Sequence, residues 1–417
     1  MKPNIIFIHV DQLNARAIRA LGCRYVSTPN LDHLFENGTS FDISYSANPV
    51  CCPARTSWYT GRMSSEHGVI DNQFTLQRDP PDLGQWLSAR GYDCCYTGKW
   101  HVPGRRVDQS FRFLYGGSGM GEYTDAAVAR AAESFLITRE GDTPFFLNVG
   151  FLNPHDICYW LFAKNPAKYE YAMFIRDALP PLPKSYDPSQ STGFNSEDEI
   201  RFYIYSYYRM VEMVDREIGR ILTALSSSRF AKNTLVLFSA DHGEMLVEHN
   251  QFTKGVLYEG SVRVPLAAYW PGVVKRGTID RDHAVSGVDI TATILDYAGA
   301  PLMPKMTFAR SLRPFIEGRS ADSWRGFIAA ENYRHDLETM IRAGTMKSIH
   351  SPAGISLFDL AKDPDELRDV AADTTYAQTA AQHKKMYSEY RSIIDPIPEP
   401  ADGWGKAAKK KGKDDYE

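Results

Sequence analysis

Short apolar runs alternate with longer amphipathic segments before about Ala300. The apolar runs are rich in Ile, Val and Phe, which is typical of buried strands; they are Ile5–Val10, Phe145–Val149 and Thr234–Phe238, and they stop at Asp11, at Gly150 and near Asp241. Other segments have the apolar spacing of helices: Asp32–Asn37, Asp82–Arg90, Asp125–Thr138 and Ser196–Leu225. This alternation predicts an α/β fold with a central, mostly parallel sheet flanked by helices.

The pattern weakens after about Ala300, where the segments Gly326–Ala330, Thr345–His350 and Ser356–Leu360 are candidate strands. A chain of 417 residues favours one large domain plus a smaller one. We therefore predict a catalytic domain at 1–320 and a C-terminal α+β subdomain at 321–395, with a small antiparallel sheet and a helix. Residues 396–417, including the run from Lys409 to Lys413, are predicted to be a solvated tail rather than an arm that binds polyanions.

Composition limits the classes of partner. The formal net charge is only -4, so no net basic field would attract nucleic acid, and an anionic substrate would need a local basic pocket. Four of the six cysteines form the adjacent pairs Cys51-Cys52 and Cys94-Cys95, unlike the spaced framework of a disulfide-stapled module. We expect mostly free thiols.

The first apolar run is too short to span a membrane and lacks a small-residue cleavage site. As given, the sequence therefore predicts a cytoplasmic protein with no membrane association. If a signal peptide has been removed, the location would instead be periplasmic or extracellular.

Acidic residues follow two of the predicted strands, Asp11 after the first and Asp241 after the third. In open α/β sheets, ligands bind beyond the carboxyl ends of the strands. We therefore expect these two carboxylates to converge at one edge of the sheet.

The most specific segment is Pro49-Val50-Cys51-Cys52-Pro53-Ala54-Arg55-Thr56-Ser57-Trp58-Tyr59-Thr60-Gly61-Arg62. Pro53 fits the first turn of a helix, and Arg55 one turn along would reach back to hold a polar side chain at position 51. The nucleophile would then lie at a helix N-terminus, whose partial charge and free N–H groups favour an anionic substrate. Taken alone, a pair of cysteines is more often a pair of packed thiols.

This Cys-x-Pro-x-Arg pattern, followed by two loosely constrained positions, two large apolar residues and Thr-Gly, resembles the signature of the type I sulfatases of the alkaline phosphatase-like superfamily. The resemblance implies an alkaline phosphatase-like sandwich fold and hydrolysis of sulfuric esters. It also implies that a formylglycine-generating enzyme oxidises Cys51 to Cα-formylglycine.

Two further segments resemble the metal-binding segments of that family. Asn4 to Gln12 is similar to its first strand, and Ser239 to Glu244 to its second metal segment; the ligands implied are Asp11, Gln12, Cys51, Asp241 and His242. Many members have Asp in place of Gln12 and Asn in place of His242. A shell of hard oxygens favours Ca²⁺ or Mg²⁺, and His242 shifts the preference toward Mn²⁺ or Zn²⁺; we expect one divalent ion, Ca²⁺ first.

Other likenesses assign basic groups to the substrate. Gly98-Lys99-Trp100-His101 is similar to a family element in which Lys99 would neutralise a sulfate oxygen and His101 would exchange a proton with the formylglycine diol. His155, in Asn153-Pro154-His155-Asp156, would either protonate the leaving alcohol or bind a sulfate oxygen, and Lys254 would contact sulfate. The segments Leu357–Leu360 and Asp363–Glu366 match a C-terminal family pattern that we interpret as structural.

The implied reaction begins when one hydroxyl of hydrated formylglycine, activated by the metal and Asp241, attacks sulfur. Lys99, Lys254 and the metal stabilise the charge. The alcohol then leaves, and the second hydroxyl, deprotonated by His101, collapses to the aldehyde and expels sulfate.

The substrate is predicted to be a sulfated mono- or oligosaccharide. Its sugar faces would stack on an aromatic segment that includes Tyr159, Trp160, Phe162, Tyr169, Tyr171 and Phe174, although the same residues would also suit a core or a dimer contact. One alternative is a phosphonate monoester or phosphodiester hydrolase on the same scaffold, favoured by Gln12 and His242 and disfavoured by the Lys99 to His101 element. Another is a non-catalytic binding protein. The oligomeric state is not predicted.

Overall fold

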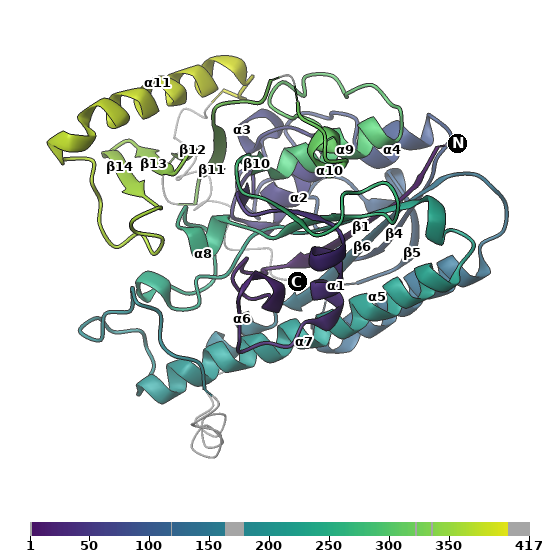
Figure 1. Ribbon diagram of the computed structural model, residues 1–417, viewed down its shortest axis with the longest axis horizontal. Helices are drawn as coiled ribbons and strands as arrows, with labels where there is room; N and C mark the ends of the chain where they lie inside the picture. The colour runs from purple at the N-terminus through teal and green to yellow at the C-terminus, as the bar shows by residue number, and fades with distance from the viewer. Residues whose placement is uncertain (1, 118, 163–178, 322, 335–336, 399–417) are drawn as a thin grey trace.

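Helices cover both faces of a central eight-stranded sheet (Figure 1). A computed structural model describes residues 2–117, 119–162, 179–321, 323–334 and 337–398, without the side chains of 160–162. In spatial order the sheet contains β5 (Arg112–Tyr115), β4 (Asp93–Gly98), β6 (Phe145–Pro154), β1 (Asn4–Asp11), β7 (Thr234–Ala240), β8 (Leu266–Tyr269), β2 (Thr39–Phe41) and β9 (Thr278–Asp280). Only β8 runs antiparallel to its neighbours, so the predicted mostly parallel sheet is confirmed.

The helices are divided between the two faces of the sheet (Figure 1). One face carries α1 (Pro29–Asn37), α5 (Gly121–Thr138) and α7 (Glu197–Ser227), and the other carries α2 (Cys51–Thr60), α4 (Leu83–Ser88), α9 (Gly287–Tyr297) and α10 (Arg313–Ile316). Shorter elements are α3 (Ser64–His67), α6 (Ile157–Phe162), α8 (Glu259–Val262) and a two-stranded pair of β3 (Ser44–Tyr45) and β10 (Val285–Ser286). The four helices predicted from spacing are all present, with bounds shifted by a few residues.

Strand β1 lies in the middle of the sheet and is buried along its whole length. Its side chains alternate between the faces. Phe7 packs edge-on against Trp58 of α2, with ring centroids 5.2 Å apart, whereas Ile6 and Ile8 pack in the cluster that contains Val211 of α7. Burial on both sides explains why the sequence of β1 is a continuous apolar run rather than an alternating one.

Strand β6 is longer than predicted, because it continues through Gly150 to Pro154. Gly150 is paired with His9 of β1 and Gly98 of β4. A Cβ at position 150 would lie 2.5 Å from the His9 ring and 2.8 Å from the carbonyl oxygen of Lys99. Glycine therefore lets three neighbouring segments approach closely at the end of the sheet, and the interpretation of Gly150 as a strand terminator was wrong.

A separate four-stranded antiparallel sheet lies near the C-terminus, with order β11 (Ile328–Asn332), β12 (Glu338–Ala343), β13 (Met346–Ser351) and β14 (Gly354–Asp359). Helix α11 (Ala377–Ile393) contacts β12 and β13. The small antiparallel sheet is confirmed, although β12, whose sequence mixes charged and apolar residues, was not predicted. The lysine run from Lys409 to Lys413 lies outside the described residues.

Two further expectations concern thiols and membranes. All six cysteines are free and buried, as expected from their spacing. Among the described helices, none combines the length and the apolar content needed to cross a bilayer.

Replacing Gly150 by Ala is expected to lower the free energy of unfolding by about 1–3 kcal/mol, because the added methyl group overpacks the junction of β1, β4 and β6. Urea unfolding followed by tryptophan fluorescence measures the change. The matched control is Gly326→Ala, where a Cβ would meet nothing within 4 Å. Equal midpoints for the two variants would contradict the close-approach argument.

Candidate active site

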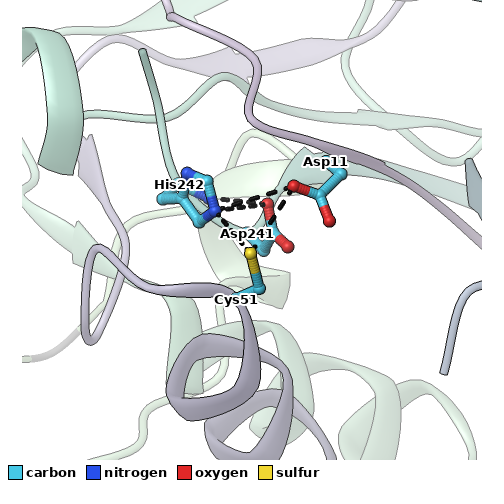
Figure 2. Close-up of side chains that lie close together, drawn as sticks. All are labelled: Asp11, Cys51, Asp241 and His242. Carbon is cyan, nitrogen blue, oxygen red and sulfur yellow. Dashed lines mark hydrogen bonds and ion pairs between the residues drawn. The ribbon is translucent and has the colours of Figure 1, made fainter. Parts of the chain in front are cut away.

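Four side chains from three parts of the chain converge beyond the sheet edge (Figure 2). Asp11 ends β1, Asp241 and His242 follow β7, and Cys51 is the first residue of α2. Their possible ligand atoms all lie within 4.8 Å of one another, and all four residues are buried. The expected convergence of Asp11 and Asp241 is confirmed, and we call these four residues the cation cluster.

The atoms of the cation cluster are oriented toward a common point. Cys51 Sγ lies 3.1 Å from His242 Nε2 and 3.7 Å from Asp11 Oδ1. His242 Nδ1 lies 2.9 Å from the carbonyl oxygen of Gly243, which only accepts hydrogen bonds. Nδ1 therefore carries a proton, and this orients Nε2 toward the other side chains of the cluster. Two carboxylates and an imidazole nitrogen around position 51 form a donor set that fits a divalent cation.

Arg55 joins the two carboxylates of the cluster. Its Nε donates to Asp241 Oδ2 at 2.8 Å and its Nη2 donates to Asp11 Oδ2 at 3.2 Å, with all three side chains fully buried. We expected Arg55 to hold the side chain of residue 51; its Nε and Nη2 bond to the carboxylates instead, and its Nη1 lies 2.8 Å from the carbonyl oxygen of Lys99 and 3.4 Å from His9 Nδ1. The carboxylates are stronger acceptors than a thiol, so they attract the buried guanidinium. Burial lowers the pKa of Arg55, but the negative charges of Asp241 and Asp11 raise it by more, so the pKa lies well above its ordinary value.

The start of α2 differs from the expectation in one respect. Cys51 does lie at the helix N-terminus, but the N–H of Cys52 donates to Asn72 Oδ1 at 3.0 Å, and Pro53 has no N–H. Neither position 52 nor position 53 therefore offers a free N–H to a substrate. Positive charge near the nucleophile comes mainly from side chains.

Two lysines supply that charge. Lys99 Nζ lies 2.5 Å from Asp11 Oδ2, and Lys254 Nζ donates to the side-chain oxygen of Gln12. Burial raises the pKa of the Cys51 thiol and so does Asp11, yet Lys254, Lys99 and His242 outweigh them and hold that pKa well below its ordinary value. The surroundings of position 51 thus stabilise negative charge.

Gln12 is engaged on both sides of its amide. Its Oε1 accepts from Lys254, and its Nε2 donates to Glu244 Oε2 at 2.5 Å and to Cys158 Sγ at 3.2 Å. Its backbone lies in the left-handed region at φ 68°. A role of Gln12 as a metal ligand stays a prediction, because this structure directs its oxygen to a lysine.

Glu244 and Cys158 are contributors that the sequence analysis did not assign. Glu244 also accepts from Tyr203 at 3.0 Å and from the N–H of Thr253 at 2.7 Å, so it fixes the loop that precedes Lys254. The signal for Glu244 was its position three residues after Asp241 in the metal segment. No pattern in the sequence indicated Cys158.

The two predicted histidines outside the cluster are placed differently. His155 is half-buried, and burial, Lys254 and Lys99 lower its pKa to about 3 against the opposing effect of Asp11, so its imidazole is neutral near pH 7. His101 is exposed at φ 55°, and none of the described hydrogen bonds joins it to the cation cluster. Its role in proton exchange stays a prediction.

Comparison with protein families identifies the chain. A family model described as Sulfatase matches residues 3–300. The chain belongs to the sulfatase family. A second model, described as N-sulphoglucosamine sulphohydrolase, C-terminal, matches residues 247–392. This second match begins before residue 321, so the predicted boundary between the two domains stays a prediction.

Curated relatives match over nearly the whole chain. An arylsulfatase of Clostridium perfringens is 28% identical and covers 93% of this chain and 94% of its own length. A choline-sulfatase of Rhizobium meliloti is 28% identical over 89% of this chain and 82% of its own. A Delta 4,5-hexuronate-2-O-sulfatase of Bacteroides thetaiotaomicron is 26% identical over 93% of this chain and 89% of its own length. Together with the family match, these relatives indicate that this sulfatase is a sulfuric ester hydrolase.

Solved structures confirm the fold. A 2-O GAG sulfatase superposes with a TM-score of 0.83 at 23% identity, covering 94% of this chain and 92% of the other. A phosphonate monoester hydrolase of Agrobacterium radiobacter superposes with a TM-score of 0.77 at 24% identity, covering 96% of this chain and 99% of the other. The predicted alkaline phosphatase-like sandwich is therefore confirmed. The family also implies a metal ion and formylglycine, and the cation cluster is a possible place for the metal.

Replacing Arg55 by Gln is expected to lower the free energy of unfolding by about 3–5 kcal/mol in metal-free protein, because two buried carboxylates lose their counter-charge. A divalent ion at the cluster would replace that charge. Adding CaCl₂ should therefore restore more stability to Arg55→Gln than it adds to the parent, as measured by thermal unfolding.

The matched control is Arg105→Gln, which breaks the buried ion pair of Arg105 with Asp82 at 2.8 Å, outside the cation cluster. It should be destabilised without any extra rescue by CaCl₂. Equal rescue of both variants would contradict a cation site between Asp11 and Asp241.

Proposed function

We propose that this sulfatase removes sulfate from a sulfated carbohydrate, with formylglycine at position 51 as nucleophile and one divalent ion, Ca²⁺ by preference, at the cation cluster. One observation carries the proposal: Cys51 Sγ lies among Asp11, Asp241 and His242 while two half-buried lysines, Lys99 and Lys254, approach the same point. A formylglycine-generating enzyme would be needed for maturation.

The donor set supports the choice of ion. The carboxylates of Asp11 and Asp241 are hard oxygen ligands that suit Ca²⁺ or Mg²⁺, and the Nε2 of His242, which faces the cluster, keeps Mn²⁺ and Zn²⁺ as alternatives. When bound, the ion would polarise a sulfate oxygen and favour the deprotonated form of a hydroxyl at position 51.

The remaining residues have separate tasks. Lys99 and Lys254 would bind sulfate oxygens. Arg55 of α2 holds Asp11 and Asp241 in position through its two ion pairs. His155 is neutral without substrate, so it is suited to donate an N–H hydrogen bond to sulfate; an anionic ester beside it would raise its pKa toward that of a proton donor for the leaving alcohol.

A carbohydrate is supported by an aromatic side chain next to His155. Tyr159 is 42% exposed, and its ring lies edge-on to the His155 imidazole with centroids 6.4 Å apart. An exposed ring beside His155 offers a flat apolar surface to a pyranose. The other members of the predicted aromatic segment, Trp160, Phe162, Tyr169, Tyr171 and Phe174, lie outside the described residues and side chains.

Replacing Cys51 by Ala is expected to abolish hydrolysis of 4-nitrophenyl sulfate, because no other side chain in the site can form the aldehyde hydrate. The matched control is Cys52→Ala, which keeps the maturation motif and should retain turnover. Mass spectrometry of the peptide that contains residue 51 verifies the aldehyde in active protein. Full turnover by Cys51→Ala would refute the proposal.

The second candidate function, hydrolysis of phosphonate monoesters, is favoured by the His242 imidazole in the cluster and by the Gln12 that neighbours Asp11. We expect kcat/KM for 4-nitrophenyl sulfate to exceed that for 4-nitrophenyl phenylphosphonate, because Lys99 and Lys254 flank position 51. Steady-state kinetics of the mature enzyme with each ester shows which of the two kcat/KM values is higher. A higher value for the phosphonate would favour the second candidate.

A further inference from the structure

The C-terminal sheet reaches the rim of the active site. The N–H of Glu331 in β11 donates to the carbonyl oxygen of Ala47 at 2.9 Å, shortly before the nucleophile helix. At the end of the same strand, Asn332 Nδ2 donates to the carbonyl oxygen of Gly255 at 3.1 Å, and Gly255 N–H in turn donates to Pro49 at 3.0 Å. The residues that follow β11 are therefore held beside the segments that carry Cys51 and Lys254.

Arg334 lies at this rim. Its Nη1 donates to the backbone carbonyl oxygen of Lys254 at 3.0 Å. The side chain of Lys254 extends inward from that point to the buried Gln12, whereas Arg334 is exposed. The guanidinium of Arg334 thus contacts the backbone of Lys254, and the ammonium group that would bind sulfate lies at the other, inner end of the Lys254 side chain.

The neighbouring glycine makes room for this arrangement. Gly255 has φ +84°, and a Cβ there would lie 2.6 Å from Cδ of Arg334. The arginine stem therefore lies directly against the backbone of the loop that follows Lys254. Any side chain at position 255 would displace it.

Within the described part of the chain, no carboxylate lies at ion-pair distance from Arg334. Among those residues, Nη1 of its guanidinium has a hydrogen-bond partner, whereas Nε and Nη2 have none. Two other arginines are instead neutralised by carboxylates: Arg263 pairs with Asp42 at 2.6 Å and Arg16 with Glu248 at 3.0 Å. A planar guanidinium with free donors is suited to bind a carboxylate or a sulfate through paired hydrogen bonds.

We propose that Arg334 determines substrate specificity by binding a second anionic group, a carboxylate or a second sulfate, on the same sulfated sugar. The inference rests on the proposed function and names its substrate class: sugars with two negative groups, one at the cation cluster and one at Arg334. The same positive charge disfavours esters whose alcohol portion is cationic.

Calorimetric titration measures the binding of the sugar apart from turnover. Cys51→Ala protein in CaCl₂ is titrated with glucosamine N,6-disulfate and with a hexuronate 2-sulfate, and compared with Cys51→Ala protein that also carries Arg334→Gln. We expect the dissociation constant of at least one sugar to rise by about tenfold to a hundredfold, because a charge-assisted pair is lost. Weakening of the uronate alone assigns a carboxylate, and weakening of the disulfated sugar alone assigns a second sulfate.

Two further variants make the result specific. Arg334→Lys keeps the charge without the planar fork and should lie between the parent and Arg334→Gln. Arg276→Gln removes an exposed arginine in the turn before β9, at an outer edge of the main sheet, and should leave both dissociation constants unchanged. Unchanged binding in Arg334→Gln, equal weakening in Arg276→Gln, or no binding of either sugar by Cys51→Ala protein would overturn the proposal.

Turnover of 4-nitrophenyl sulfate, which has no second negative group, separates this inference from the function on which it rests. In the mature enzyme, Arg334→Gln should lower kcat/KM for the sugars with two negative groups by a larger factor than for that ester, and an equal loss on both kinds of substrate would show that Arg334 only supports the loop of Lys254. Absence of turnover by the mature parent would instead refute the proposed function, whatever the titrations show.

Discussion

The site depends on the burial of two like charges side by side. Asp11 ends β1 and Asp241 directly follows the neighbouring parallel strand β7, so the sheet itself brings their carboxylates together and removes them from water. Arg55 compensates both from the helix that carries position 51, and Lys99 adds a second positive charge at Asp11. Without these partners, the repulsion and desolvation of the carboxylates would oppose folding at this edge.

This arrangement couples the nucleophile to the sheet. Because Arg55 lies one turn after Cys51 in α2, the hydrogen bonds that neutralise the carboxylates also fix the start of the helix against β1 and β7. The thiol is consequently held among the same atoms that are able to bind a cation. The same hydrogen bonds of Arg55 therefore stabilise the packing of α2 on β1 and β7 and fix the position of residue 51.

The outer part of the site has a different origin. Lys254 and Glu244 are carried by the chain that follows β7, and the C-terminal sheet adds Arg334 through contacts with the same loop. The inner contacts surround position 51 and would serve any sulfuric ester, whereas the rim is exposed and is formed partly by a separate sheet. A division of this kind allows one reaction centre to be combined with different alcohol portions of the substrate.

The sequence by itself determined the α/β class, the buried strand β1, the segment that begins with Cys51 and the acidic residues at strand ends, because each is encoded in a short stretch with its own periodicity or motif. Only the tertiary structure decided which partner each group has. Arg55 bonds to Asp11 and Asp241 rather than to residue 51, Gln12 faces Lys254, and Gly150 continues a strand because His9 and Lys99 approach it. Contacts between residues far apart in the chain depend on how the strands are ordered and how closely they approach, and no local pattern contains that information.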